Sequence, residues 1–135
     1  MLHDHARSMA DARTDVLIIS TDATIGSLLS VLLELNGLRV CFYEGGPLSS
    51  AVERCRPLAA IADCDHSAAC EPAAIAELRA HGVRPILFSP KRLDAEVRER
   101  AEAEGVPWFV LPMRHAELGA LVRRTIGDAG PVAAA

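Results

Sequence analysis

The chain has 135 residues, half of them apolar, and carries a formal net charge of -4. This length suits one domain with its own core and is too short for two domains of ordinary size. The acidic balance offers no basic surface for nucleic acid, so we expect protein partners and no nucleic-acid binding.

The sequence holds no apolar run near the ~18 residues that would cross a bilayer. Its first residues, from Met1 to His5, are too polar for a signal peptide. We therefore expect a cytoplasmic protein that does not contact a membrane.

The cysteines give no sign of a bonded framework. Cys41, Cys55, Cys64 and Cys70 form neither a C-x-x-C pair nor a regular spacing. This spacing favours reduced thiols over disulfides, and a zinc site would need closer pairing.

Short apolar runs alternate with longer segments of helical period along the chain. Strands are expected at 16–19, 38–43, 58–62, 85–88 and 106–111, and helices at 24–36, 49–55, 72–81, 93–104 and 115–126. The alternation indicates parallel strands joined by crossover helices, in a three-layer, doubly wound α/β fold. We expect a domain over 14–126, with flexible tails at 1–13 and 127–135.

Local signals support these elements. The first strand, Val16 to Ile19, is an unbroken aliphatic run of the kind that is buried on both faces of a parallel sheet. Asp22 or Thr24 can cap the first helix, which is expected to end near Asn36. The carboxyl ends of the strands, where ligands gather in such sheets, are followed by the segments Ser20-Thr21-Asp22, Asp63-Cys64-Asp65, Ser89-Pro90 and Leu111-Pro112.

These positions follow a known pattern. Asp63 closes an apolar third strand six residues after Pro57, and Ser89 stands 22 residues before Leu111. The segment from Ile19 to Gly37 fits, without gaps, a first loop and helix of the same pattern. Over roughly residues 15–126, the chain resembles the receiver domain of bacterial two-component response regulators, in an atypical form of the chemotaxis type.

The resemblance implies a flavodoxin-like sheet of strand order 2-1-3-4-5. It also implies that Asp63 holds the position of the phosphoacceptor, that Ser89 and Trp108 hold the positions of the switch residues, and that Pro112 follows a cis peptide bond. In the family, a pair of acids holds Mg²⁺ and a lysine contacts the phosphoryl oxygens.

The departures from the family concern the charged residues. Ser20 and Thr21 stand where the acidic pair is expected, and Leu111 stands where the lysine is expected. The remaining candidates for Mg²⁺ ligands are Asp22, Asp63 and Asp65, and their spacing differs from that of the family. Mg²⁺ binding is therefore doubtful, and phosphorylation at Asp63 is expected to be slow or absent.

The leading hypothesis is an atypical receiver domain in phosphorelay signalling, acting by protein–protein contact and not as an enzyme. Its partners would be a histidine kinase or a downstream signalling protein, with a homodimer through residues 93–104, 106–111 and 115–126 as a further expectation. One alternative is a binding module for a small molecule at the strand ends. Another is a working phosphoacceptor at Asp63 with substitute acids.

Structural roles remain open for the same residues. Asp63 can cap the turn that follows its strand, Ser20 and Thr21 can bind amides at the helix start, and Ser89 can begin a turn. Trp108 can serve as core packing alone. No dinucleotide, Walker or nucleophile-elbow motif is present.

Overall fold

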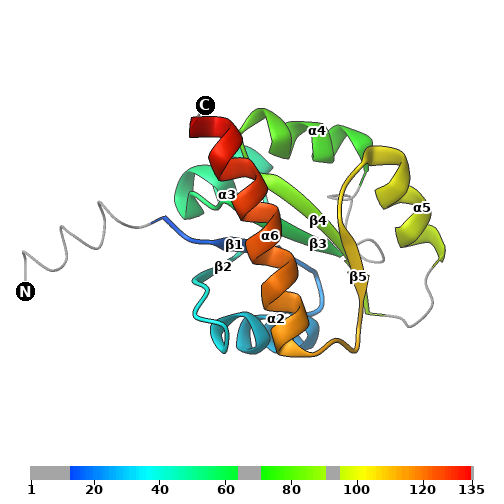
Figure 1. Cartoon of the computed structure of the whole chain (residues 1–135). Coiled ribbons are helices and arrows are strands. Elements are labelled where there is room, and N and C mark those ends of the chain that lie inside the picture. The colour runs from blue at the N-terminus through cyan, green and yellow to red at the C-terminus, as the bar shows by residue number, and fades with distance from the viewer. Residues whose placement is uncertain (1–12, 64–70, 91–94, 135) are drawn as a thin grey trace, which may run out of the picture.

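A single parallel sheet forms the centre of the protein (Figure 1). The computed structural model describes residues 13–63, 71–90 and 95–134. The elements in chain order are β1 (Val16–Ile19), α2 (Ala23–Glu34), β2 (Val40–Phe42), α3 (Leu48–Cys55), β3 (Ala59–Asp63), α4 (Pro72–Ala80), β4 (Arg84–Ser89), α5 (Ala95–Glu104), β5 (Trp108–Val110) and α6 (His115–Ala134). The five strands are parallel and lie in the order β2-β1-β3-β4-β5, which confirms the predicted fold class.

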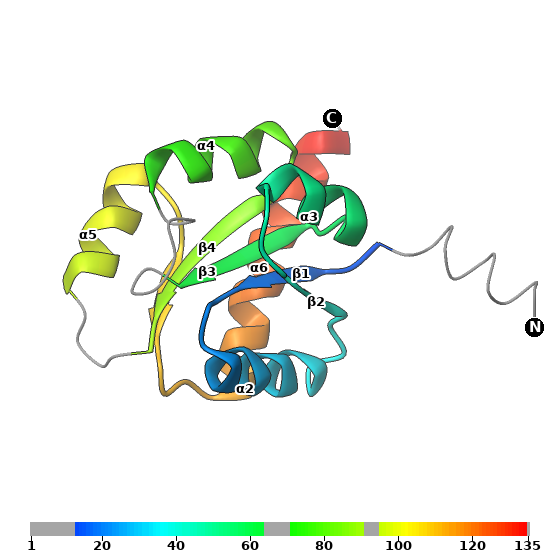
Figure 2. The same ribbon diagram turned by 180° about the vertical axis from the view of Figure 1, so that it is seen from behind.

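The sheet is covered on both faces, as an all-parallel sheet requires. Helices α2 and α6 lie on one face, and α3, α4 and α5 lie on the other (Figures 1 and 2). The central strands β1 and β3 are buried along their whole length because both of their faces meet helices. Because the strands are parallel, the carboxyl ends of β1, β3 and β4 lie at the same end of the sheet.

Helix α2 begins where the sequence indicates. The Asp22 side chain accepts hydrogen bonds from the backbone amides of Thr24, at 2.9 Å, and Ile25, at 3.1 Å. This is an N-cap, which satisfies amides that have no partner inside the helix. The predicted cap at Asp22 is confirmed.

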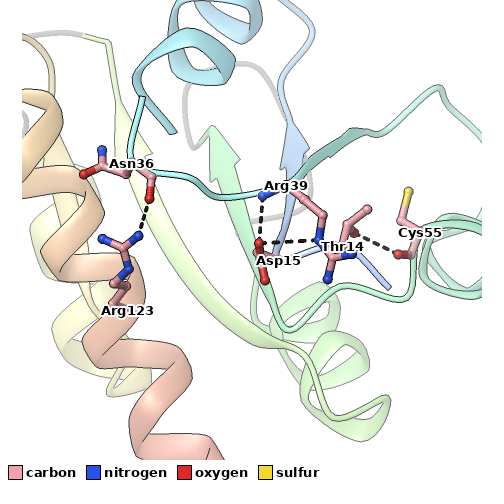
Figure 3. Close-up of polar contacts among 6 residues, drawn as sticks. All are labelled: Thr14, Asp15, Asn36, Arg39, Cys55 and Arg123. Carbon is pink, nitrogen blue, oxygen red and sulfur yellow. Dashed lines mark hydrogen bonds and ion pairs between the residues drawn. The ribbon is translucent and has the colours of Figure 1, made fainter. Parts of the chain in front are cut away.

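Polar contacts connect the elements at the other end of the sheet, where β1 begins (Figure 3). The backbone N–H of Arg39 donates to Asp15 Oδ2 at 2.7 Å, and Thr14 Oγ1 donates to the carbonyl of Cys55 at 2.8 Å. The Arg123 guanidinium donates to the carbonyl of Asn36. These contacts join β1, α3, α6 and the loop after α2 at the edge away from Asp63.

The last helix is longer than expected. The sequence predicts an end at Ile126, because Gly130 and Pro131 are helix breakers, yet α6 runs to Ala134. The segment also holds Ala129, Ala133 and Ala134, and alanine has the highest helix propensity. The peptide bond between Leu111 and Pro112 is cis, as expected.

The expectation of reduced thiols is wrong for two cysteines. Cys41 and Cys55 are joined by a disulfide, with their Cα atoms 6.0 Å apart. Helix α3 folds back so that its last residue meets β2, a proximity that a spacing of 14 residues does not reveal. Cys64 and Cys70 lie outside the described residues.

Four large apolar side chains are exposed among the residues whose burial the structure describes. Leu28, Val31 and Leu35 lie on α2 or directly after it, and Phe42 ends the edge strand β2. Among the described residues, no helix is both long and apolar enough to cross a membrane.

Candidate functional site

Asp63 is the central residue of the candidate site. It is the last residue of β3, lies opposite Phe88 of β4 in the strand register, and is fully buried. The preceding residues Ala59 to Ala62 are small or β-branched and are also fully buried, so the strand places the carboxylate at the end of the sheet without exposing it. A buried carboxylate needs hydrogen-bond partners.

One partner comes from the end of β1. Ser20 Oγ lies 3.2 Å from Asp63 Oδ2 and donates a hydrogen bond to it. The same hydroxyl accepts from the backbone N–H of Asp22 at 3.2 Å, and the carbonyl of Asp22 lies farther away, at 3.5 Å. Ser20 thus holds the turn before α2, the structural role considered for it, and also contacts the phosphoacceptor position.

The side chains described near Asp63 do not form a set of ligands for a divalent cation. Asp22 is exposed, and its Oδ1 already accepts from two amides at the start of α2. Thr21 is exposed and brings no carboxylate, and Asp65 lies outside the described residues. Within residues 13–63, 71–90 and 95–134, no group of three or more His, Cys, Asp or Glu side chains could hold a metal. Since Mg²⁺ prefers several oxygen ligands in a near-octahedral set, these residues do not provide its site.

Leu111 lies where the resemblance expects a lysine. Its side chain is only 5% exposed and belongs to the apolar cluster on the α2 and α6 face, together with Phe88, Phe109 and Leu118. Its backbone N–H donates to the carbonyl of Ser89 at 3.0 Å, which extends the pairing of β4 with β5. Leu111 therefore contributes packing and backbone pairing, and no positive charge.

Ser89 and Trp108, which the resemblance places at the switch positions, lie on neighbouring strands. Ser89 ends β4, pairs with Val110 in the register, and is fully buried. Trp108 begins β5 and is half-buried against the core on the α3, α4 and α5 face. It also borders an open hollow of about 650 Å³ that is lined by Met113, Arg114 and Glu117, among others.

Two contacts cannot be foreseen from the sequence, one at Asp63 and one at the disulfide between Cys41 and Cys55. The sequence offers Ser20 as a turn residue or as the replacement of an acid, and gives no sign that its hydroxyl contacts Asp63, the last residue of the neighbouring strand. It also gives no sign of the contact made by Arg54, whose Nη1 atom lies 3.4 Å from Cys41 Sγ. The strand order supplies the signal for the first contact, while the second depends on the fold of α3.

No protein-family model matches the chain, and no curated protein matches it. Solved structures do. A response regulator receiver protein from Burkholderia phymatum is 24% identical, with a TM-score of 0.69 over 85% of this chain and 96% of that one. The signal receiver domain of a modulated diguanylate cyclase from Desulfovibrio desulfuricans is 21% identical, with a TM-score of 0.70 over 87% and 97%.

A third structure is the receiver domain of a sensor histidine kinase from Pseudomonas aeruginosa, with a magnesium ion coordinated in its active site cleft. It is 24% identical, with a TM-score of 0.66 over 85% of this chain and 98% of that one. The superposition covers 96–98% of each of these three structures, with TM-scores of 0.66 to 0.70. The chain therefore has the fold of response regulator receiver domains.

Proposed function

We propose that the chain is a receiver-like signalling domain that acts by binding protein partners, with phosphorylation at Asp63 weak or lost. The observation that carries this proposal is the burial of Leu111 in the apolar cluster, at the position where a receiver needs a cation. No other orientation of the Leu111 side chain could supply the positive charge, because leucine is uncharged.

Phosphoryl transfer depends mainly on positioning and on electrostatic stabilisation of the phosphoryl oxygens. A pair of unit charges ~4 Å apart at an effective dielectric of ~20 interacts by about 4 kcal/mol. Leu111 stands in place of the lysine, and Asp22 is used as a helix cap. An acyl phosphate on Asp63 would therefore lack both the lysine charge and a carboxylate that could hold Mg²⁺ beside it. The fold retains the acceptor carboxylate while the groups that make it reactive are replaced.

The similarity to receiver domains supports one class of partner. The similar structures include a response regulator and the receiver domain of a sensor histidine kinase, which supports a histidine kinase or a downstream signalling protein as the partner. A homodimer through α5, β5 and α6 belongs to the same proposal, and the exposed part of α5 carries charges of both signs.

The test is intact-mass spectrometry after incubation with acetyl phosphate or beryllofluoride and Mg²⁺. We expect little or no adduct on the wild-type protein and none on Asp63→Asn. The matched variant Ser20→Asp/Thr21→Asp/Leu111→Lys restores the missing charges and should gain an adduct that disappears when Asp63→Asn is added. A wild-type adduct that depends on Asp63 and is as abundant as that of the restored variant would overturn the proposal and favour the working phosphoacceptor.

A further inference from the structure

The disulfide between Cys41 and Cys55 lies on the face covered by α3, between the edge strand and the end of that helix. We propose that it is a redox-active site that exchanges with low-molecular-weight thiols of the glutathione class and thereby controls how firmly β2 is held. The proposal is independent of phosphorylation at Asp63.

The two sulfurs differ in access. Cys55 is 1% exposed and lies in the apolar core with Leu17 and Ala51. Cys41 is partly exposed, because β2 is the edge strand and pairs on one side only, with β1. An incoming thiolate can therefore reach Cys41 Sγ and not Cys55 Sγ, since exchange requires access to the sulfur that is attacked.

Arg54 is positioned to favour release of Cys41 as a thiolate. Its Nη1 atom lies 3.4 Å from Cys41 Sγ, and its Nη2 atom donates to the carbonyl of Phe42 at 2.9 Å. The bond to Phe42 fixes the guanidinium beside the sulfur, and the ion pair with Glu44, at 3.9 Å, is exposed. A neighbouring cation stabilises a thiolate over the neutral thiol.

The exchange proceeds in two balanced steps. A glutathione thiolate attacks Cys41 Sγ, a mixed disulfide forms, and the electron pair of the broken S–S bond goes to Cys55 Sγ, which takes a proton from water. A second glutathione thiolate attacks the glutathione sulfur of the mixed disulfide and releases Cys41 as a thiolate beside Arg54. The protein disulfide is reduced to two thiols, and two glutathione molecules are oxidised to glutathione disulfide.

Reduction removes the one covalent link seen between β2 and α3 in the described chain. Strand β2 has only three residues, and a short edge strand with few buried contacts opens more easily than a central one. The end of α3 stays attached elsewhere, because Thr14 donates twice to the carbonyl of Cys55, through N and Oγ1. The opening should therefore be confined to β2.

The first test uses the full chain with Cys64→Ser and Cys70→Ser, so that only the proposed pair remains. In buffer without thiol, native-state alkylation should label neither cysteine, and after incubation with reduced glutathione it should label Cys41. Hydrogen exchange at residues 40–42 should rise on reduction while exchange in β3 stays unchanged. Labelling of Cys41 without any reductant, or equal exchange in both states, would overturn the proposal.

The second test separates the roles of the two sulfurs. With oxidised glutathione, Cys55→Ser should accumulate a glutathione adduct on Cys41, and Cys41→Ser should give none on Cys55. Cys55→Ala is a second variant for the case in which serine in the core prevents folding, and the hydrogen-exchange comparison on the Cys64→Ser/Cys70→Ser chain requires neither variant. An adduct that forms on Cys55 and not on Cys41 would contradict the assignment.

The third test addresses Arg54. Arg54→Gln should slow the release of Cys41 from its mixed disulfide with glutathione about fivefold, which corresponds to ~1 kcal/mol for a charge pair at ~4 Å in water. Arg124→Gln removes the same charge from an exposed position of α6, a helix on the other face of the sheet from α3, and should leave the rate unchanged. Equal rates for Arg54→Gln and the wild type would remove Arg54 from the mechanism.

Discussion

The side chain of Asn36 fills the space that a β-carbon on Gly119 would occupy. Asn36 Nδ2 donates to the carbonyls of Leu32, at 2.8 Å, and His115, at 2.6 Å. Since Leu32 lies in α2 and His115 begins α6, one amide joins the two helices that cover the same face of the sheet. Gly119 permits this contact by leaving room for the amide.

Gly119→Ala should destabilise the protein by about 1–2 kcal/mol, although alanine is the better helix former. The added methyl displaces the Asn36 amide, and the hydrogen bonds that are lost are worth about 0.5–1.5 kcal/mol each. Gly127→Ala, in the same helix with open space around its Cα, should instead be stabilising by roughly 0.5–1 kcal/mol. Urea denaturation measures both, and a stabilised Gly119→Ala would show that the amide moves without cost.

Two leucines at the end of α2 should differ sharply in their contribution to stability. Leu33 is fully buried and Leu35 is 63% exposed. Leu33→Ala should cost about 2–5 kcal/mol because it leaves a cavity, whereas Leu35→Ala should stay within about 0.5 kcal/mol of the wild type. Thermal unfolding of the two variants under one buffer is sufficient, and a large loss for Leu35→Ala would indicate that this residue is covered in solution.

Restoring the acidic pair should create a dependence of stability on Mg²⁺. In Ser20→Asp/Thr21→Asp, the added carboxylates lie close to the buried Asp63, so that like charges destabilise the fold until a cation binds. The melting temperature should be lower than that of the wild type and should rise when Mg²⁺ is added. At a Mg²⁺ concentration of 100 times Kd, the gain in the free energy of unfolding should be about 2.7 kcal/mol.

The wild type serves as the control for that variant, and its melting temperature should not change with Mg²⁺. Adding Asp63→Asn to the double variant should reduce the response, because one ligand of the restored site is lost. A wild-type response of equal size would mean that the natural residues already bind the ion.

The proposed dimer through α5, β5 and α6 predicts a dependence on the arginines of α5. Arg98→Glu/Arg100→Glu reverses two charges on this face and should weaken association in sedimentation velocity runs, more so at low salt. Arg56→Glu/Arg84→Glu makes the same change of charge at exposed positions outside α5, β5 and α6 and should leave association unchanged. If both variants sediment like the wild type, this face does not carry a dimer.

The order of strands and helices could be predicted because the apolar runs are distinct and because the residues that begin or end each element act locally. Asp22 and the glycine after Asn36 each act within a few residues, so their effect is visible in sequence. The disulfide could not be predicted in this way, because Cys41 and Cys55 meet only after α3 has packed on the sheet. The end of α6 differs from the prediction because Gly130 and Pro131 indicate a stop, whereas the helix continues through both residues.

The candidate site could also be predicted only in part. The positions of Asp63, Ser89 and Leu111 at strand ends follow from counting residues along parallel strands, and the structure places them there. The direction of each side chain does not follow from counting. The hydrogen bond from Ser20 to Asp63 and the packing of Leu111 toward α6 depend on the twist of the sheet and on the helices above it.

Trp108 is the single tryptophan of the chain and is half-buried at the edge strand β5. Because an indole that is partly open to water changes its emission when its surroundings change, the protein carries an intrinsic fluorescent reporter beside the strand ends. Events at that edge of the sheet, including the arrival of a partner, can therefore be followed in the unlabelled protein.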